Sequence, residues 1–165
     1  MFGVIFCFSG CFEAKTSISE KKGDHNFEKR LYKKAIVSWL KALDENPSPA
    51  RLYTKIGKAY FRLSETDQAE TYYEKAVRLT PNDEMIQKQL VKILIIKGDY
   101  AKALKRMDLI KNHCERQKDF YILYGDLYMV SGDYSNAEAA YRECIDIYGT
   151  EPRIAIKLAI CLEKI

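Results

Sequence analysis

Residues 50–83 read ARLYTKIGKAYFRLSETDQAETYYEKAVRLTPND, and two amphipathic patterns follow each other within this stretch. Apolar side chains recur every three or four residues over 50–63, and they do so again over 67–79. That spacing places an apolar stripe on one side of a helix, and such a stripe has to pack against another element. We therefore predict two helices joined by a short turn, each covering the other's apolar stripe.

The same unit recurs along the chain with a period of 34 residues. Four alanines are spaced by this period, and a large side chain follows each of them four residues later. The pairs are Ala35 with Trp39, Ala69 with Tyr73, Ala103 with Met107, and Ala137 with Tyr141. A fixed period of this length indicates helix–turn–helix units stacked into a solenoid.

The turns between the units carry residues suited to ending and starting helices. Gly98-Asp99 recurs one period later as Gly132-Asp133. We expect each glycine to end a helix in the left-handed conformation and each aspartate to cap the helix that follows. Pro81 is expected to stop the second helix of its unit.

With these residues in view, the chain resembles the tetratricopeptide repeat (TPR) family. The best-matching unit carries the signature residues Tyr53, Ile56, Gly57, Tyr60, Ala69, Tyr73, Ala76 and Pro81. The resemblance implies an all-α, right-handed solenoid of antiparallel helix pairs, with about three full repeats and partial terminal units. The predicted TPR domain covers 24–165, divided into a partial unit 24–49, full units 50–83, 84–117 and 118–151, and a partial unit 152–165.

Composition and motifs argue against catalysis. The 165 residues are 47% hydrophobic and 30% charged, which is typical of a globular chain, and the net charge is only +4. No metalloprotease, P-loop or dinucleotide-binding motif occurs. We therefore expect a protein that is not an enzyme and that uses no cofactor and no metal ion. Because the charge is mild and no RNA-reading repeat code is present, we expect no nucleic-acid partner either.

The cysteines do not form a disulfide framework, because they are odd in number and scattered along a helical chain. They are Cys7, Cys11, Cys114, Cys144 and Cys161. Two of them, Cys144 and Cys161, lie in neighbouring predicted elements. The sequence leaves open whether these two pair or fill small buried positions as free thiols.

The resemblance to TPR proteins implies that the first helices of the units line a concave groove that binds a protein or peptide. The predicted groove residues are Arg51, Lys55, Lys58, Phe61, Arg62, Lys88 and Lys92. Like charges four residues apart, as at Lys88 and Lys92, cost a helix roughly 0.2–0.5 kcal/mol each. A surface that tolerates this repulsion is a candidate site for an acidic segment, and the alternative is an ordinary lysine-rich surface.

The N-terminus resembles a bacterial lipoprotein signal, with Phe8-Ser9-Gly10-Cys11 in the place of the lipobox. On this interpretation residues 1–10 are a signal, Cys11 carries the lipid and residues 11–23 form a polar tether. No Lys or Arg precedes the apolar run, which departs from secretory signals. We expect a scaffold anchored in the bacterial envelope, facing the periplasm, that holds an assembly or secretion partner. The alternative is a soluble cytosolic TPR adaptor.

The last stretch, 153–165, has apolar residues on all sides and few charges. A helix of this composition is normally buried on more than one face. We expect it either to pair with a second copy or a partner, or to remain a half-covered terminal helix.

Overall fold

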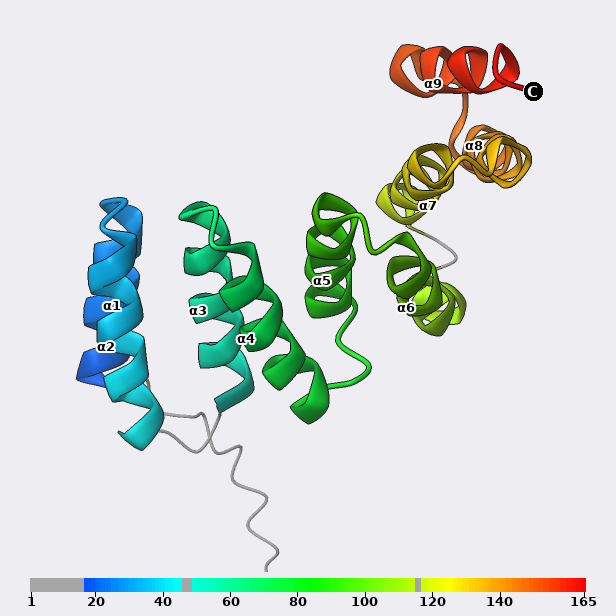
Figure 1. The fold of residues 1–165 in the computed structure, drawn as a ribbon. Helices are drawn as coiled ribbons and strands as arrows, with labels where there is room; N and C mark the ends of the chain where they lie inside the picture. The colour runs from blue at the N-terminus through cyan, green and yellow to red at the C-terminus, as the bar shows by residue number, and fades with distance from the viewer. Residues whose placement is uncertain (1–16, 46–48, 115–116) are drawn as a thin grey trace, which may run out of the picture.

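In the computed structural model, which describes residues 17–45, 49–114 and 117–165, the chain is all helical. Antiparallel helix pairs follow one another in a curved row, and a single helix completes the row at the C-terminal end (Figure 1). The helices are α1 (Ile18–Glu28), α2 (Tyr32–Glu45), α3 (Pro49–Arg62), α4 (Thr66–Leu79), α5 (Glu84–Lys97), α6 (Tyr100–Cys114), α7 (Lys118–Ser131), α8 (Tyr134–Tyr148) and α9 (Pro152–Leu162).

The first unit is more complete than the predicted partial unit 24–49. Helix α1 begins at Ile18, and the Ser17 side chain caps it by accepting a hydrogen bond from the backbone N–H of Glu20 at 3.1 Å. The predicted tether, 11–23, and the predicted domain start at residue 24 are therefore wrong at this boundary. Helices α1 and α2 form a full pair, so four pairs precede α9 within the described residues.

The expected turn chemistry is present in part, since the Asp99 carboxylate accepts from Lys102 Nζ at 3.1 Å and is not shown to cap α6. Gly98 and Gly132 end α5 and α7 in the left-handed conformation, with φ of 78° and 81°. The Asp133 side chain caps α8 by accepting from the backbone N–H of Asn136 at 3.2 Å. Helix α4 ends at Leu79, shortly before Pro81, as proline requires.

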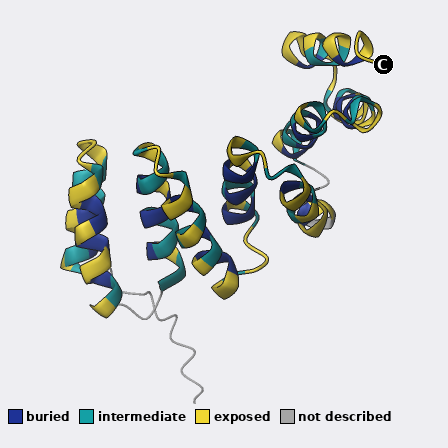
Figure 2. Ribbon diagram, in the orientation of Figure 1, coloured by how far each residue is buried: buried dark blue, intermediate teal, exposed yellow. Residues whose placement is uncertain are grey.

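The core runs along the inside of the row, where the two helices of each unit face each other (Figure 2). The large residue of each second helix is at most 2% exposed and packs over a small residue of the first helix in three of the units. A Cβ atom added at Gly125 would lie 2.4 Å from the Tyr141 ring, and one added at Gly23 would lie 2.4 Å from the Trp39 ring. These glycines therefore set how closely the paired helices approach.

Candidate partner-binding groove

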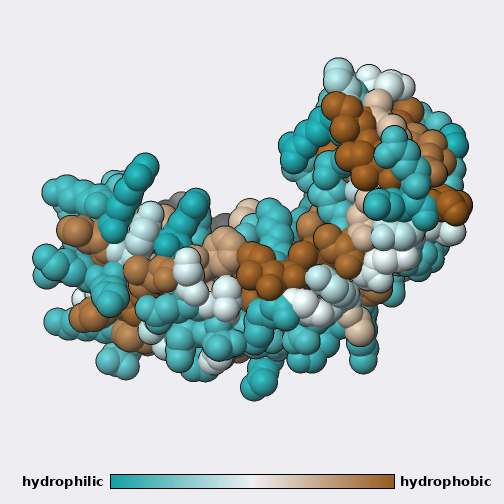
Figure 3. Space-filling view, turned by 45° about the horizontal axis from the view of Figure 1, so that its top comes forward, coloured by the Kyte–Doolittle hydropathy of each residue, from teal (hydrophilic) through white to brown (hydrophobic). Residues whose placement is uncertain are grey.

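A hollow of about 600 Å³ lies on the inner side of the curve, over the first helices of the later units. In Figure 3 hydrophobic surface gathers in the middle of the molecule, where the row turns toward its C-terminal helices. We call this hollow the apolar groove. It is lined by Phe61 of α3, Lys92, Ile95 and Ile96 of α5, Leu123, Asp126, Met129 and Val130 of α7, Tyr141 of α8, and Lys157 and Ile160 of α9.

The repeat explains why these side chains meet. Phe61, Ile95 and Met129 are spaced by one period of 34 residues and occupy the same position of successive first helices. The same relation joins Lys92 to Asp126 and Ile160, Ile96 to Val130, and Leu123 to Lys157. Stacking the units brings equivalent positions side by side, so a few positions per helix generate a continuous surface.

Most of the charge in the apolar groove is already satisfied. Asp126 accepts hydrogen bonds from the Tyr141 hydroxyl at 2.6 Å and from Lys157 Nζ at 2.5 Å. Burial, followed by the bond to Asp126, raises the pKa of Tyr141 above its ordinary value, so the phenol stays neutral. Lys92 is exposed and forms no ion pair with any residue the structure describes. One cation is therefore available to a ligand in an otherwise apolar and neutralised surface.

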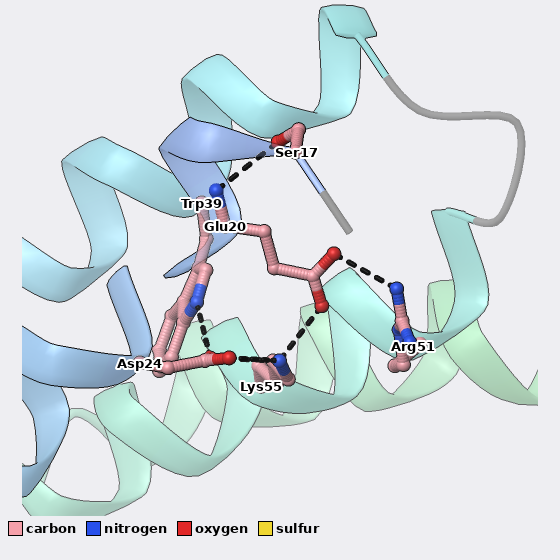
Figure 4. A network of polar contacts seen from close by, with 6 residues as sticks. All are labelled: Ser17, Glu20, Asp24, Trp39, Arg51 and Lys55. Atoms are coloured by element: carbon pink, nitrogen blue, oxygen red, sulfur yellow. Dashed lines mark hydrogen bonds and ion pairs between the residues drawn. The ribbon is translucent and has the colours of Figure 1, made fainter. Parts of the chain in front are cut away.

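The predicted basic surface is largely engaged within the protein at its N-terminal end. The carboxylate of Glu20, which is fully buried, lies 2.8 Å from Arg51 Nη2 and 2.7 Å from Lys55 Nζ. Lys55 also contacts Asp24 at 2.7 Å, and Asp24 accepts from the Trp39 indole N–H at 3.0 Å (Figure 4). Arg51 and Lys55 thus join α3 to α1, and their charge is compensated.

The remaining predicted groove residues lie in different surroundings. Lys58 lies over the Phe27 ring, 5.4 Å from its centroid, and Lys88 donates to Gln117. Phe61 and Lys92 line the apolar groove, and Arg62 is exposed. That any of these residues binds a partner stays a prediction.

Sequence reasoning missed Ile96, Leu123, Met129, Val130 and Ile160, which supply most of the apolar lining. Their signal was available in the period of 34 residues. Lys92 moved forward by two periods reaches Ile160, and Phe61 moved forward by two periods reaches Met129.

Two of the cysteines are free thiols buried at different contacts. Cys161 Sγ lies 3.0 Å from the Tyr134 carbonyl oxygen, and Cys144 Sγ lies 3.9 Å from that of Lys118. Burial raises the pKa of both thiols, which keeps them protonated and unreactive.

Neither a metal-binding cluster nor a membrane-spanning helix occurs in the part of the chain that the structure describes. No group of three or more His, Cys, Asp or Glu side chains is placed to hold a metal ion there. The helices there are also too short or too polar to cross a bilayer.

Comparisons with known proteins agree with this architecture. A family model for the tetratricopeptide repeat matches residues 50–83 and 119–150. Tetratricopeptide repeat protein 21B of Mus musculus is 30% identical over 92 residues, which cover 56% of this chain and only 7% of that protein.

Two solved structures share the fold. A crystal structure of MamA protein has a TM-score of 0.82 at 21% identity, covering 90% of this chain and 81% of that one. A tetratricopeptide repeat protein from Parabacteroides merdae has a TM-score of 0.83 at 19% identity, covering 88% and 58%. The predicted all-α solenoid is confirmed, and residues 50–83 and 119–150 match the tetratricopeptide repeat.

Proposed function

We propose that this protein is a scaffold that holds an apolar segment of a partner protein in the apolar groove. Tetratricopeptide repeats generally bind other proteins, and their curvature provides an extended concave surface for doing so. The observation that carries the proposal is the hollow itself, which is lined on four successive first helices by apolar side chains. Apolar side chains that water can reach are the usual signature of an interaction surface.

The charges in the apolar groove define the partner further. Asp126 is compensated by Lys157 and Tyr141, whereas Lys92 is not compensated among the described residues. A segment that carries apolar residues and one carboxylate would place that carboxylate near Lys92. The partner segment thus needs fewer acidic residues than the predicted basic surface implied, because Arg51 and Lys55 already bind Glu20.

The test is a selection from a random peptide library displayed on phage, with the full chain as bait. We expect the selected peptides to share apolar residues and an Asp or Glu. Replacing the exposed groove residues Ile96 and Ile160 with Glu should lower the affinity for these peptides by tenfold or more, because about 1.4 kcal/mol of apolar contact would be lost. The matched control is Leu109→Glu on α6, which is 64% exposed and lies outside the groove.

Binding that survives in the groove variant, or that the control abolishes equally, would contradict the proposal. A further variant, Lys92→Met, separates the two parts of the interaction. It should lower the affinity of peptides that carry a carboxylate and leave purely apolar peptides unchanged.

The placement of the scaffold in a bacterial envelope, beside an assembly or secretion partner, belongs to the same proposal. It is supported by the apolar run that precedes Cys11 in the sequence, a stretch outside the described residues. The intact mass of the mature protein, recovered separately from membranes and cytosol, tests it. Loss of residues 1–10 with a lipid-sized gain supports anchoring, and an unmodified soluble chain supports the cytosolic adaptor.

A further inference from the structure

The N-terminal end of the solenoid carries a concentration of cations that the groove does not use. Every one of them is exposed, and none forms an ion pair within the described residues. We call this surface the basic end face. Its cations are Lys21, Lys22, Lys29, Arg30, Lys33, Lys34 and Lys41.

Three of these cations lie together on the first helix pair. Lys22 of α1 and Lys29 at its C-terminal cap are seven residues apart, and Lys34 and Lys41 repeat this spacing on α2. Lys22 of α1 and Lys33 and Lys34 of α2 line a single shallow hollow together with Val37, which is 68% exposed. The two helices thus both contribute cations to one hollow.

The positive charge of this face results from the way α1 distributes its charges. Its carboxylates Glu20 and Asp24 point toward α3, where Arg51 and Lys55 bind them. By helical spacing, Lys22 lies on the other side of α1 from Glu20. The exposed acidic residues of this pair, Glu28, Asp44 and Glu45, are fewer than the cations listed above.

Comparison with the later units shows that this face differs from an ordinary repeat surface. Lys22 and His25 are exposed, whereas the residues one period later, Ile56 and Ala59, are fully buried against the preceding unit. The first pair therefore has charged side chains where the other units have a stacking surface. In Figure 3 hydrophilic side chains dominate this end of the molecule.

We propose that the basic end face binds an anionic lipid surface. Clusters of four to eight Lys or Arg beside an apolar anchor are typical of proteins held at anionic membranes, because one weak anchor needs a second attraction. In this chain the lipid proposed at Cys11 would supply the weak anchor shortly before the basic end face in the sequence, so the inference rests on the proposed function in this respect. A broad surface of flexible lysines suits a fluid layer of negative charges better than a single shaped ligand.

Nucleic acid is the other polyanion that such a surface could attract. Proteins that bind single strands combine cations with exposed aromatic rings on which bases stack. The aromatic residues of this pair turn inward instead, since Phe27 packs on Tyr32 and Trp39 with ring centroids 5.2 and 5.6 Å apart. The surface therefore favours lipid.

The experiment is co-sedimentation of the full chain with vesicles. Wild type should bind vesicles that contain phosphatidylglycerol more strongly than pure phosphatidylcholine vesicles, and added salt should weaken this preference. The triple variant Lys22→Glu, Lys33→Glu, Lys34→Glu should have an affinity for anionic vesicles lower by on the order of 100-fold. Circular dichroism should show an unchanged fold, because all three side chains are exposed.

The matched control is Lys102→Glu, Lys105→Glu, Lys164→Glu, which changes the net charge equally at exposed positions elsewhere. This variant should keep nearly all the binding to anionic vesicles. Equal binding of wild type to both kinds of vesicle, or an equal loss in the two triple variants, would overturn the proposal. Tighter binding of a short RNA than of anionic vesicles would overturn it in favour of nucleic acid.

Discussion

The two ends of the solenoid present opposite surfaces to their surroundings. At the N-terminal end, α1 carries Lys22 where the next unit has the buried Ile56. At the C-terminal end, Ala159 of α9 is exposed, although its counterparts Gly57 and Gly125 lie under the second helix of their units. The first end is therefore a polar cap, whereas the second is an apolar face that no described helix covers.

The difference extends to how each end is held. Helix α1 is joined to α3 by a buried carboxylate and two cations, while α9 packs through Ile154 and Cys161, both fully buried. Helix α1 buries few apolar side chains, so its ion pairs with α3 add to the packing of Phe27 on Trp39. The apolar helix α9 docks readily and still has an apolar face left over. Four predictions test this contrast.

The largest effect is expected from Arg51→Met with Lys55→Met. This double variant would deprive the buried carboxylate of Glu20 of both cations, which should cost about 3–5 kcal/mol of unfolding free energy in urea titrations. The control is Lys97→Met, because one of its partners, Asp67, is 86% exposed and such surface pairs contribute about 0–1 kcal/mol. Equal losses in the two variants would show that Glu20 does not hold the N-terminal end.

At high pH the large residues of the second helices should differ in how much folding stability they retain. Trp39 at the N-terminal end does not titrate, whereas burial raises the pKa of Tyr73 to about 12, partly offset by Arg62. The unfolded chain releases this proton first, near pH 10, so stability is complete below that pH and falls as the pH rises toward 12. The loss attributable to Tyr73 is about 2–3 kcal/mol.

Denaturant titrations of wild type and Tyr73→Phe between pH 8 and 12 measure this loss. The variant should have the flatter profile, because phenylalanine carries no ionisable group. Parallel profiles would indicate that the hydroxyl of Tyr73 ionises equally in the folded and unfolded chains.

Packing inside the later units gives a smaller effect. In Gly125→Ala the new Cβ would lie 2.4 Å from the Tyr141 ring, and overpacking of this kind costs about 1–3 kcal/mol. The gain in helix propensity offsets roughly 1 kcal/mol, leaving a net loss of about 1 kcal/mol. The comparison variant, Gly57→Ala, places its Cβ 3.1 Å from Tyr73 and should be nearly neutral in thermal unfolding. A larger loss at Gly57 would reverse this interpretation.

The smallest effect concerns the free face of α9, where self-pairing stays a prediction. Leu162 is 46% exposed, so covering it would contribute about 1 kcal/mol to association. We expect sedimentation velocity to show association that increases with concentration, and Leu162→Glu should weaken it about fivefold. A single monomeric species at every concentration would leave α9 as a half-covered terminal helix.

The site was less predictable than the fold. Phe61 and Lys92 were assigned to the groove from the resemblance to the family, and the structure places both in the apolar groove. The predicted cations Arg51 and Lys55 instead bind Glu20 and Asp24, which are 31 to 35 residues away in the sequence. No local pattern reports whether a charged side chain meets a partner from another unit.

The sequence by itself determined the helices, their turns and the stacking of the units. Helical periodicity, left-handed glycines and caps act over a few residues, and a period of 34 residues repeats them. Only the tertiary structure decided which surface is open for binding. The exposure of a side chain and the compensation of its charge depend on the neighbour that stacking brings to it. Stacking places Glu20 beside Arg51, whereas it leaves Lys92 without an ion pair among the described residues and leaves Ala159 exposed.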